Sequence, residues 1–174
     1  MRMAADPGAA AGPRPPDDWL DGGLTCPAQA ARALRLHAAE QRCRELVLRS
    51  AACVDAGDAA GLAALFTADA RLTRPGGALL HGQPAIAKAY ADRPAGRITR
   101  HLVCGTLFDD IGEDQAQATS QVLVWTADAA GAPGPHGRPA HPLQRIGHFA
   151  DRFVRTPDGW RISQRQAGFD LFSG

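Results

Sequence analysis

Residues 147–166, GHFADRFVRTPDGWRISQRQ, are the stretch that decides the fold. Two runs rich in aromatic and β-branched side chains flank the tetrapeptide TPDG at residues 156–159. In such a turn, proline fixes one φ angle and glycine accepts a positive φ, which is the chemistry that tight turns between strands require. The stretch therefore predicts a β-hairpin made of two long strands.

The first strand of this hairpin interleaves charges with aromatic side chains. Because side chains alternate across a strand, one face is shared by every second residue: Phe149, Asp151, Phe153 and Arg155. Aromatic walls with a few polar groups are typical of ligand pockets, so we expect this face to point inward and Asp151 and Arg155 to contact a ligand. Alternatively, the arginines of the hairpin lie on a solvated outer face, where their stems cover apolar surface.

Three helices are predicted upstream of the hairpin. Apolar and small residues at three- and four-residue spacing mark the first helix over about residues 28–56, and Gly57 can form its left-handed cap. Asp58 is placed to cap a second helix over residues 59–66. A third helix is expected over about residues 82–92.

The remaining elements are predicted to be strands. Short strands are expected near residues 71–74 and 78–81, and long strands over residues 98–108 and 116–127. A loop rich in Gly, Pro and His, residues 129–142, then leads to the hairpin. Helices followed by a meander of long strands predict an α+β fold, in which the N-terminal helices pack into the concave face of a strongly curved antiparallel sheet.

Composition restricts the class of protein. A chain of 174 residues fits one domain, which we place at residues 28–174, after a Pro-, Gly- and Ala-rich extension over residues 1–27 that is predicted to be disordered or loosely docked. The formal net charge of +1 creates no field that would attract nucleic acid or an anionic membrane, and no apolar run is long enough to span a bilayer. The four cysteines lack the paired spacing of a zinc or redox motif, and no signal peptide is recognised, so we expect reduced thiols and a cytoplasmic location.

Three segments carry a resemblance to a known family: residues 50–71, SAACVDAGDAAGLAALFTADAR; residues 80–92, LHGQPAIAKAYAD; and the hairpin motif DRFVRTPDGWRI. Together they resemble the SnoaL-like group of the nuclear transport factor 2-like superfamily, which includes polyketide cyclases, dehydratases and dehydrochlorinases. The resemblance implies a cone-shaped, cystatin-like α+β barrel. Because this fold hosts unrelated chemistries and also non-catalytic subunits, it does not by itself imply a function.

Many lyases of this family share an Asp at the end of the first helix and a His on the first long strand, and the matching positions here are Asp55 and His101. The resemblance implies that His101 is a general base and Asp55 its partner. A buried carboxylate that accepts a hydrogen bond from one imidazole nitrogen fixes the tautomer, so that the other nitrogen can take up a proton. Alternatively, Asp55 belongs only to the turn that ends the helix, and His101 is structural.

The sequence departs from the lyase pattern beside this pair. Relatives often carry a Tyr or Lys about one helical turn before the Asp, where this chain has Arg49, Ser50 and Ala51. An acid or electrophile would have to come from one of four other groups: Arg49, Asp151, Arg155 or Arg165. The candidates for aromatic walls of a substrate pocket are Phe149, Phe153, Trp125 and Tyr90.

The leading hypothesis is a small cofactor-independent enzyme that abstracts a proton from a hydrophobic, cyclic or polyketide-like molecule, with elimination, isomerisation or cyclisation to follow. No metal site is predicted, because the histidines lack the spacing of metal-binding motifs. The alternatives are a non-catalytic small subunit of a ring-hydroxylating dioxygenase, which is similar in fold and size, and a ligand-binding module. A homo-oligomer, either dimer or trimer, is expected because an apolar outer sheet face is normally buried against another subunit.

Overall fold

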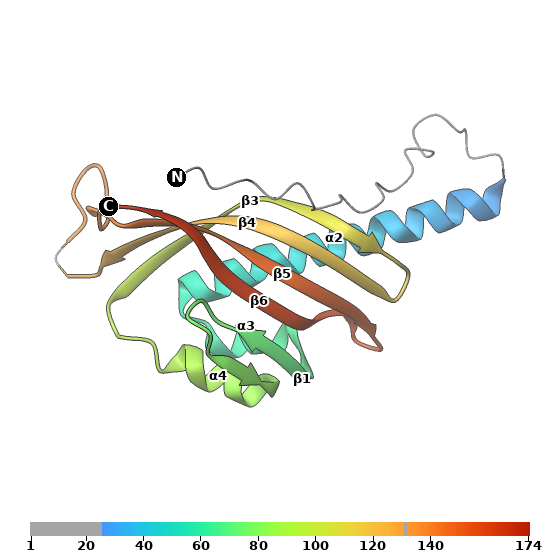
Figure 1. Cartoon of the computed structure of the whole chain (residues 1–174), viewed down its shortest axis with the longest axis horizontal. Helices are drawn as coiled ribbons and strands as arrows, with labels where there is room; N and C mark the ends of the chain where they lie inside the picture. The colour runs from blue at the N-terminus through green and yellow to red at the C-terminus, as the bar shows by residue number, and fades with distance from the viewer. Residues whose placement is uncertain (1–25, 131) are drawn as a thin grey trace, which may run out of the picture. The chain divides into compact units, whose positions relative to one another are not determined.

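The structure, a computed structural model, describes residues 26–130 and 132–174 (Figure 1). The chain divides into two compact units, Met1–Leu34 and Arg35–Gly174, and the second unit contains every strand of the described residues. Of the extension predicted over residues 1–27, only Cys26 and Pro27 are described, and Pro27 already belongs to a helix.

The described residues form three helices. α2 (Pro27–Ala56) and α3 (Ala59–Ala64) come before the first strand, and α4 (Gly82–Ala91) follows the second. The junction between α2 and α3 follows the sequence closely. Gly57 takes a φ of 73°, which glycine adopts without the steric conflict of a Cβ atom. Asp58 then caps α3, because its carboxylate accepts a hydrogen bond of 2.7 Å from the backbone N–H of Gly61.

The second helix is shorter than its sequence predicts. The spacing of apolar residues favours a helix to Phe66, but α3 ends at Ala64 and Phe66 is the first residue of strand β1 (Phe66–Thr73). Sheet pairing explains the difference, since Phe66 lies beside Ile162 and the backbone N–H of Ile162 donates to the Leu65 carbonyl at 2.9 Å. These long-range contacts prevail over the local helical pattern.

The strands form one six-stranded sheet in the order β2-β1-β6-β5-β4-β3. Besides β1, its members are β2 (Leu79–His81), β3 (Arg97–Ile111), β4 (Gln115–Asp128), β5 (Gln144–Thr156) and β6 (Gly159–Ser173). The predicted hairpin is confirmed as β5 and β6, which pair antiparallel around a turn where Gly159 has a φ of 101°. The α+β class and the long meander β3–β6 that the sequence predicts are confirmed as well.

One pairing in the sheet differs from an all-antiparallel arrangement. Strand β1 lies parallel to β6, while the other neighbours are antiparallel, so the sheet is mixed. Parallel neighbours need a long crossover connection, and here the chain from β2 to β5 supplies it. The sequence pattern of β1 contains no signal for the direction of its partner.

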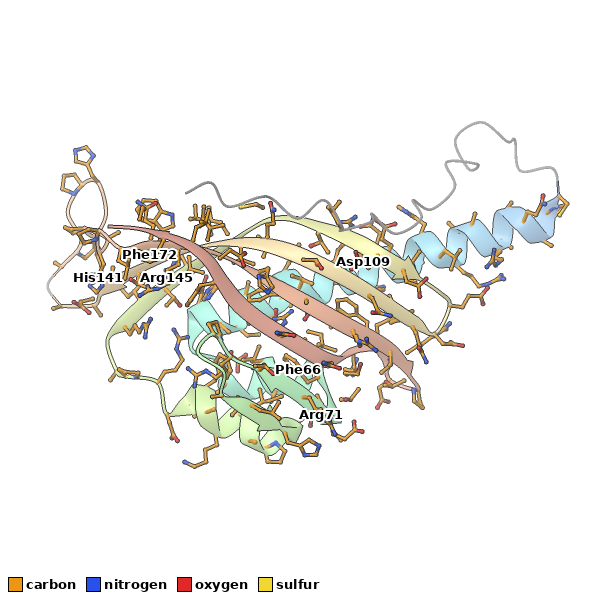
Figure 2. The ribbon with its side chains drawn as sticks, in the orientation of Figure 1. Phe66, Arg71, Asp109, His141, Arg145 and Phe172 are labelled. Atoms are coloured by element: carbon orange, nitrogen blue, oxygen red, sulfur yellow. The ribbon has the colours of Figure 1, made fainter. Side chains whose placement is uncertain are left out.

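The helices cover one face of the sheet, which we call the inner face (Figure 1). Cys43 and Val47 of α2 belong to the same buried cluster as Ala118 of β4 and Phe153 of β5. Phe66 is fully buried and lies between β6 and the helical layer (Figure 2). Along β4, buried and more exposed residues alternate, which marks the two faces of the strand.

The opposite, outer face carries exposed apolar side chains. Four aliphatic residues stand directly opposite one another on neighbouring strands and form a continuous row, which we call the outer row: Leu102, Leu123, Ile146 and Leu171. Leu102 is 49% exposed and Leu171 is 64% exposed. No helix among residues 26–130 and 132–174 covers this row.

No helix among residues 26–130 and 132–174 combines the length and the apolar character that a bilayer crossing needs.

Candidate active site

Asp55 and His101 meet on the inner face of the sheet. Asp55 lies in the last turn of α2, and His101 lies on β3 directly opposite Val124 of β4. The Asp55 Oδ1 atom is 2.6 Å from the His101 Nδ1 atom, and both side chains are about 85% buried, with exposed fractions of 14% and 15%. The structure therefore brings together the two residues that the family resemblance paired.

A second hydrogen bond fixes the orientation of this pair. The backbone N–H of His101 donates to the Oδ2 atom of Asp55 at 2.7 Å, so the carboxylate holds both the main chain and the ring of the same residue. With an ionised Asp55, the ring proton belongs on Nδ1, and Nε2 carries a free lone pair. The arrangement leaves Nε2 as the nitrogen that can accept a proton from a bound molecule.

The ionised state of Asp55 is favoured by its hydrogen bonds. Burial opposes ionisation of this carboxyl, but the ring and the backbone N–H of His101, together with the Thr99 hydroxyl, stabilise its charged form. The net result is that the pKa of Asp55 is held below its ordinary value. Asp55 is therefore a carboxylate at neutral pH, as an orienting partner for an imidazole must be.

Two further residues hold Asp55 in place. Thr99 is two residues before His101 on the same face of β3, and its hydroxyl donates to Asp55 Oδ1 at 2.9 Å. Arg93 donates to the Thr99 hydroxyl at 3.2 Å and to the Val54 carbonyl at 2.7 Å, which ties the end of α2 to the start of β3. The pair is thus supported by a chain of hydrogen bonds from three elements.

His101 borders a cavity of about 130 Å³, which Asp55 itself does not line. A single water needs roughly 10–15 Å³ measured in this way, so the cavity has room for a small organic molecule. Much of its wall is apolar: Ala51, Val54, Leu62, Leu72, Val122, Val124, Phe149 and Phe169. His101 and Thr99 contribute polar groups from β3.

A second polar group reaches this cavity from β6. Arg165 is only 5% exposed and forms two parallel hydrogen bonds of 2.7 Å to the carboxylate of Asp151, its direct neighbour on β5. A third N–H donates to the Ser50 hydroxyl at 2.7 Å, and the guanidinium lies 4.2 Å from the centre of the Phe149 ring. Arg165 therefore presents a rigidly held guanidinium, whose charge is paired with Asp151, beside the apolar wall.

The structure separates the other predicted site residues into two groups. Phe149 and Tyr90 line the cavity, whereas Asp151 lies behind Arg165 and does not line it. Phe153 is 1% exposed and belongs to the buried core instead.

Trp125 and Arg155 also lie away from the cavity. Trp125 stands opposite Arg100 on the outer side of β3 and β4, where it borders a different depression. Arg155 is exposed at the end of β5, next to the turn, so the alternative that this arginine is solvated describes its position. Arg49 also points away, toward Glu45, with which it forms an exposed ion pair of 2.7 Å.

Sequence reasoning missed several groups that line the cavity or support the pair. Thr99 could have been found from the two-residue period of a strand, once His101 was placed on the inner face. Arg74, Arg93 and Arg97 had no such signal, because they stand at the ends of elements, where no periodicity applies. Within residues 26–130 and 132–174, no group of three His, Cys, Asp or Glu side chains lies close enough together to hold a metal ion.

Comparisons with known proteins agree with this architecture. A family model described as the SnoaL-like domain matches residues 36–166. Among curated proteins, no sequence matches the chain.

Solved structures give the same fold. A nuclear transport factor 2-like protein with a cystatin-like fold from Novosphingobium aromaticivorans is 25% identical, with a TM-score of 0.68 over 84% of this chain and 92% of that one. A hexachlorocyclohexane dehydrochlorinase, LinA type 2, is 15% identical, with a TM-score of 0.68 over 81% and 91%. ActVI-ORFA from Streptomyces coelicolor is 24% identical, with a TM-score of 0.60 over 78% and 98%. The last two identities are low enough that they show the fold alone.

Proposed function

The chain belongs to the SnoaL-like domain family, and from this premise we propose that it is a cofactor-independent enzyme that abstracts a proton from an apolar small molecule. The observation that carries the proposal is the 2.6 Å contact between Asp55 and His101 at the wall of a cavity. A general base has to lie within hydrogen-bond reach of the proton it removes, and His101 borders the space in which a ligand would lie.

Each group of the site has a role in this chemistry. His101 Nε2 takes the proton, and the Asp55 carboxylate stabilises the imidazolium that forms. Negative charge develops on the substrate at the same time, and an N–H group of Arg165 beyond the three that bond to Asp151 and Ser50 donates to it. Elimination, isomerisation or cyclisation then depends on which bond of the substrate breaks or forms next.

The apolar wall selects the substrate class. The cavity that His101 borders is also lined by Val122 and Val124 of β4 and Phe149 of β5. An apolar molecule should therefore bind there more tightly than a polar one. A ring fits such a wall because a flat apolar face can stack on Phe149. These contacts support a hydrophobic, cyclic substrate.

A proton-abstraction probe tests the proposal without knowledge of the natural substrate. In 5-nitrobenzisoxazole, a base removes the C–H proton, the electron pair of that bond forms a nitrile, and the N–O bond breaks to release a coloured phenolate. We expect the wild-type protein to accelerate this elimination over buffer, and His101→Asn to lower the rate on the order of 100-fold, because the base is removed while its shape is kept.

A matched control is another His–Asp pair outside the cavity. His141 lies 3.1 Å from Asp128, and 47% of its side chain is exposed. We expect His141→Asn to leave the rate of elimination unchanged. A wild-type rate no faster than buffer, or a His101→Asn variant as fast as the wild type, would contradict the enzyme and favour the ligand-binding module.

A further inference from the structure

Four arginines line the cavity, and none of its lining residues is Asp or Glu. Arg165 is neutralised by Asp151, as described above. The other three come from the segments that surround α4. Arg74 follows β1, Arg93 follows α4, and Arg97 begins β3. One part of the cavity wall is therefore strongly positive, although the chain as a whole is close to neutral.

Arg74 and Arg97 have no ion-pair partner within the described part of the chain. Arg74 is half-buried and lies 5.4 Å from the centre of the Tyr90 ring, which leaves its N–H donors available. Arg97 is exposed, and no hydrogen bond of its side chain is present among residues 26–130 and 132–174. Arg93, by contrast, is occupied by Val54 and Thr99.

The three arginines are close enough to repel one another. Burial is the largest cause that lowers the pKa of Arg93, and the positive charges of Arg97 and Arg74 lower it further. The carboxylate of Asp55 offsets part of this repulsion at Arg93, but Arg74 and Arg97 have no ion-pair partner among the described residues, and a bound anion would relieve the repulsion that remains. The cluster has the electrostatic character of a site for a negatively charged group.

The rest of the cavity wall is apolar. Val122, Val124, Phe149 and Phe169 line it on the long strands β4, β5 and β6. A ligand that satisfies both walls needs an apolar body and a negatively charged group. A planar guanidinium matches the two oxygens of a carboxylate better than it matches a neutral amide, which cannot accept two charge-assisted bonds.

We propose that the ligand of this cavity is an apolar carboxylate, whose carboxylate group is bound by Arg74 and Arg97 and whose body packs on the apolar wall next to His101. This inference names the substrate class of the proposed enzyme. Binding of the carboxylate is inferred from the arginines alone, and only its conversion rests on the proposed function.

Matched pairs of ligands test the role of the charge. The probes are benzoate and benzamide, cyclohexanecarboxylate and cyclohexanecarboxamide, and 1-naphthoate and 1-naphthamide, titrated calorimetrically at low salt. In each pair the two molecules have nearly the same shape and differ in charge. We expect at least one carboxylate to bind about 10-fold more tightly than its amide, and added salt to reduce the difference.

Variants locate the binding group. Arg74→Gln and Arg97→Gln should each lower the preference for the carboxylate several-fold, and the double variant should abolish it. Arg152→Gln is the control, because Arg152 is an exposed arginine on the outer side of β5, opposite Gln117 and Gln164. It should keep the preference of the wild type. Thermal unfolding of each variant establishes that it is folded.

Three results would overturn the inference: no carboxylate binds at about 10 mM, amides bind as tightly as carboxylates, or the double variant keeps the preference. His101→Asn separates this test from that of the proposed function. One outcome is that carboxylates bind to His101→Asn with unchanged preference while the wild type does not catalyse the elimination of the probe. This result would support the proposed ligand class and contradict the proposed enzymatic function. If the wild type converts the probe but binds amides as tightly as carboxylates, the result would support the proposed enzymatic function and contradict the proposed ligand class.

Discussion

The inner and the outer face of strands β3–β6 are built from the same four strands but hold different chemistry. On the inner face, buried polar side chains occur together with their partners, such as Asp151 with Arg165 and Thr106 with Ser120. On the outer face, aliphatic side chains of the outer row are exposed, and no helix of the part of the chain that the structure describes covers them. Polar groups on the inner face are therefore buried with specific partners, whereas the outer row leaves apolar surface exposed.

The difference follows from the cost of desolvation. A charge on the inner face has lost water and must find a partner, so each such group restricts its neighbours to particular residues and positions. A charge on the outer face keeps its water, and its neighbours are hardly restricted. The comparison predicts that equal substitutions on the two faces of one strand have very different effects.

The largest difference is expected between Asp151 and its neighbour Arg152. Asp151→Ala leaves the guanidinium of Arg165 buried without its carboxylate, and we expect it to lower the free energy of unfolding by about 3–5 kcal/mol. Arg152→Ala, on the exposed side of the same strand, should change it by less than about 0.5 kcal/mol. Urea unfolding of both variants measures the difference.

A double variant identifies the cause of that loss. Asp151→Leu combined with Arg165→Met removes both charges from the inner face and keeps side chains of similar size. It should be more stable than Asp151→Ala, because no uncompensated charge remains. If the double variant is instead the less stable of the two, packing rather than charge determines the effect, and the contrast between the faces loses its electrostatic basis.

The thiol of Cys43 gives the next largest effect, as a dependence on pH. Burial, followed by the negative charge of Asp151, raises its pKa to about 12, whereas the thiol of an unfolded chain titrates near roughly 8.5. The stabilisation that this difference provides is complete below about pH 8.5 and is lost as the pH rises, because only the unfolded chain then releases the proton. The expected loss is about 1.4 kcal/mol per pH unit between the two pKa values.

Cys43→Ala isolates this contribution from the other groups that titrate in alkali. Its free energy of unfolding should fall less steeply than that of the wild type between about pH 9 and pH 11. Cys104→Ala is the outer-face control, because Cys104 is exposed on β3, and it should keep the slope of the wild type. Equal slopes for Cys43→Ala and the wild type would show that the inner face is more hydrated than the structure indicates.

A smaller effect is expected at a neutral hydrogen bond of the inner face. The hydroxyls of Thr106 and Ser120 lie 2.8 Å apart on paired positions of β3 and β4, and Ser120 is fully buried. Ser120→Ala leaves the Thr106 hydroxyl without this partner and should lower the free energy of unfolding by about 1 kcal/mol. Thr106→Val with Ser120→Ala should recover part of the loss, and Gln121→Ala on the outer face should have little effect. The measurement is urea unfolding of the four proteins.

The same contrast explains which features could be predicted from the sequence. The α2–α3 junction and the β5–β6 hairpin follow from local chemistry, since Gly57, Asp58 and residues 156–159 act on their own neighbours. The parallel pairing of β1 with β6 could not be predicted, because the direction of a partner strand is not encoded in the pattern of one strand.

The candidate site could be predicted only in part for a related reason. The contact between Asp55 and His101 joins residues that are 46 positions apart, and it was expected from a family resemblance rather than from spacing. Arg155 and Phe153 share strand parity with Phe149, but parity gives only a face, and the cavity occupies one section of that face. Whether an inner-face residue lines the cavity depends on its position along the strand, because the helices that cover the sheet fill the other sections of that face.

Substitutions in the outer row are expected to have the smallest effects on stability. Their effect on self-association of the chain is the more informative measurement. Leu102→Arg with Leu171→Arg should change the free energy of unfolding of the single chain by no more than about 0.5 kcal/mol, because both side chains are already half exposed. The sequence predicts a homo-oligomer, and the outer row is the surface that a second copy of the chain would cover. The double variant should therefore be monomeric where the wild type associates, as measured by light scattering over a range of concentrations, and the wild-type mass should distinguish dimer from trimer.

Gln117→Arg with Gln164→Arg is the matched control for this experiment, because it adds the same two charges to the outer face, on either side of Arg152 and away from the outer row. It should leave the association unchanged, since a non-polar contact is disrupted by a charge placed within it and hardly by one placed beside it. A wild-type protein that stays monomeric at about 100 μM would show that the apolar side chains of the outer row can remain exposed to water. The prediction of a homo-oligomer would then be wrong. Equal disruption by Gln117→Arg with Gln164→Arg would assign the association to net charge rather than to the outer row, because the two double variants differ only in the position of the added charges.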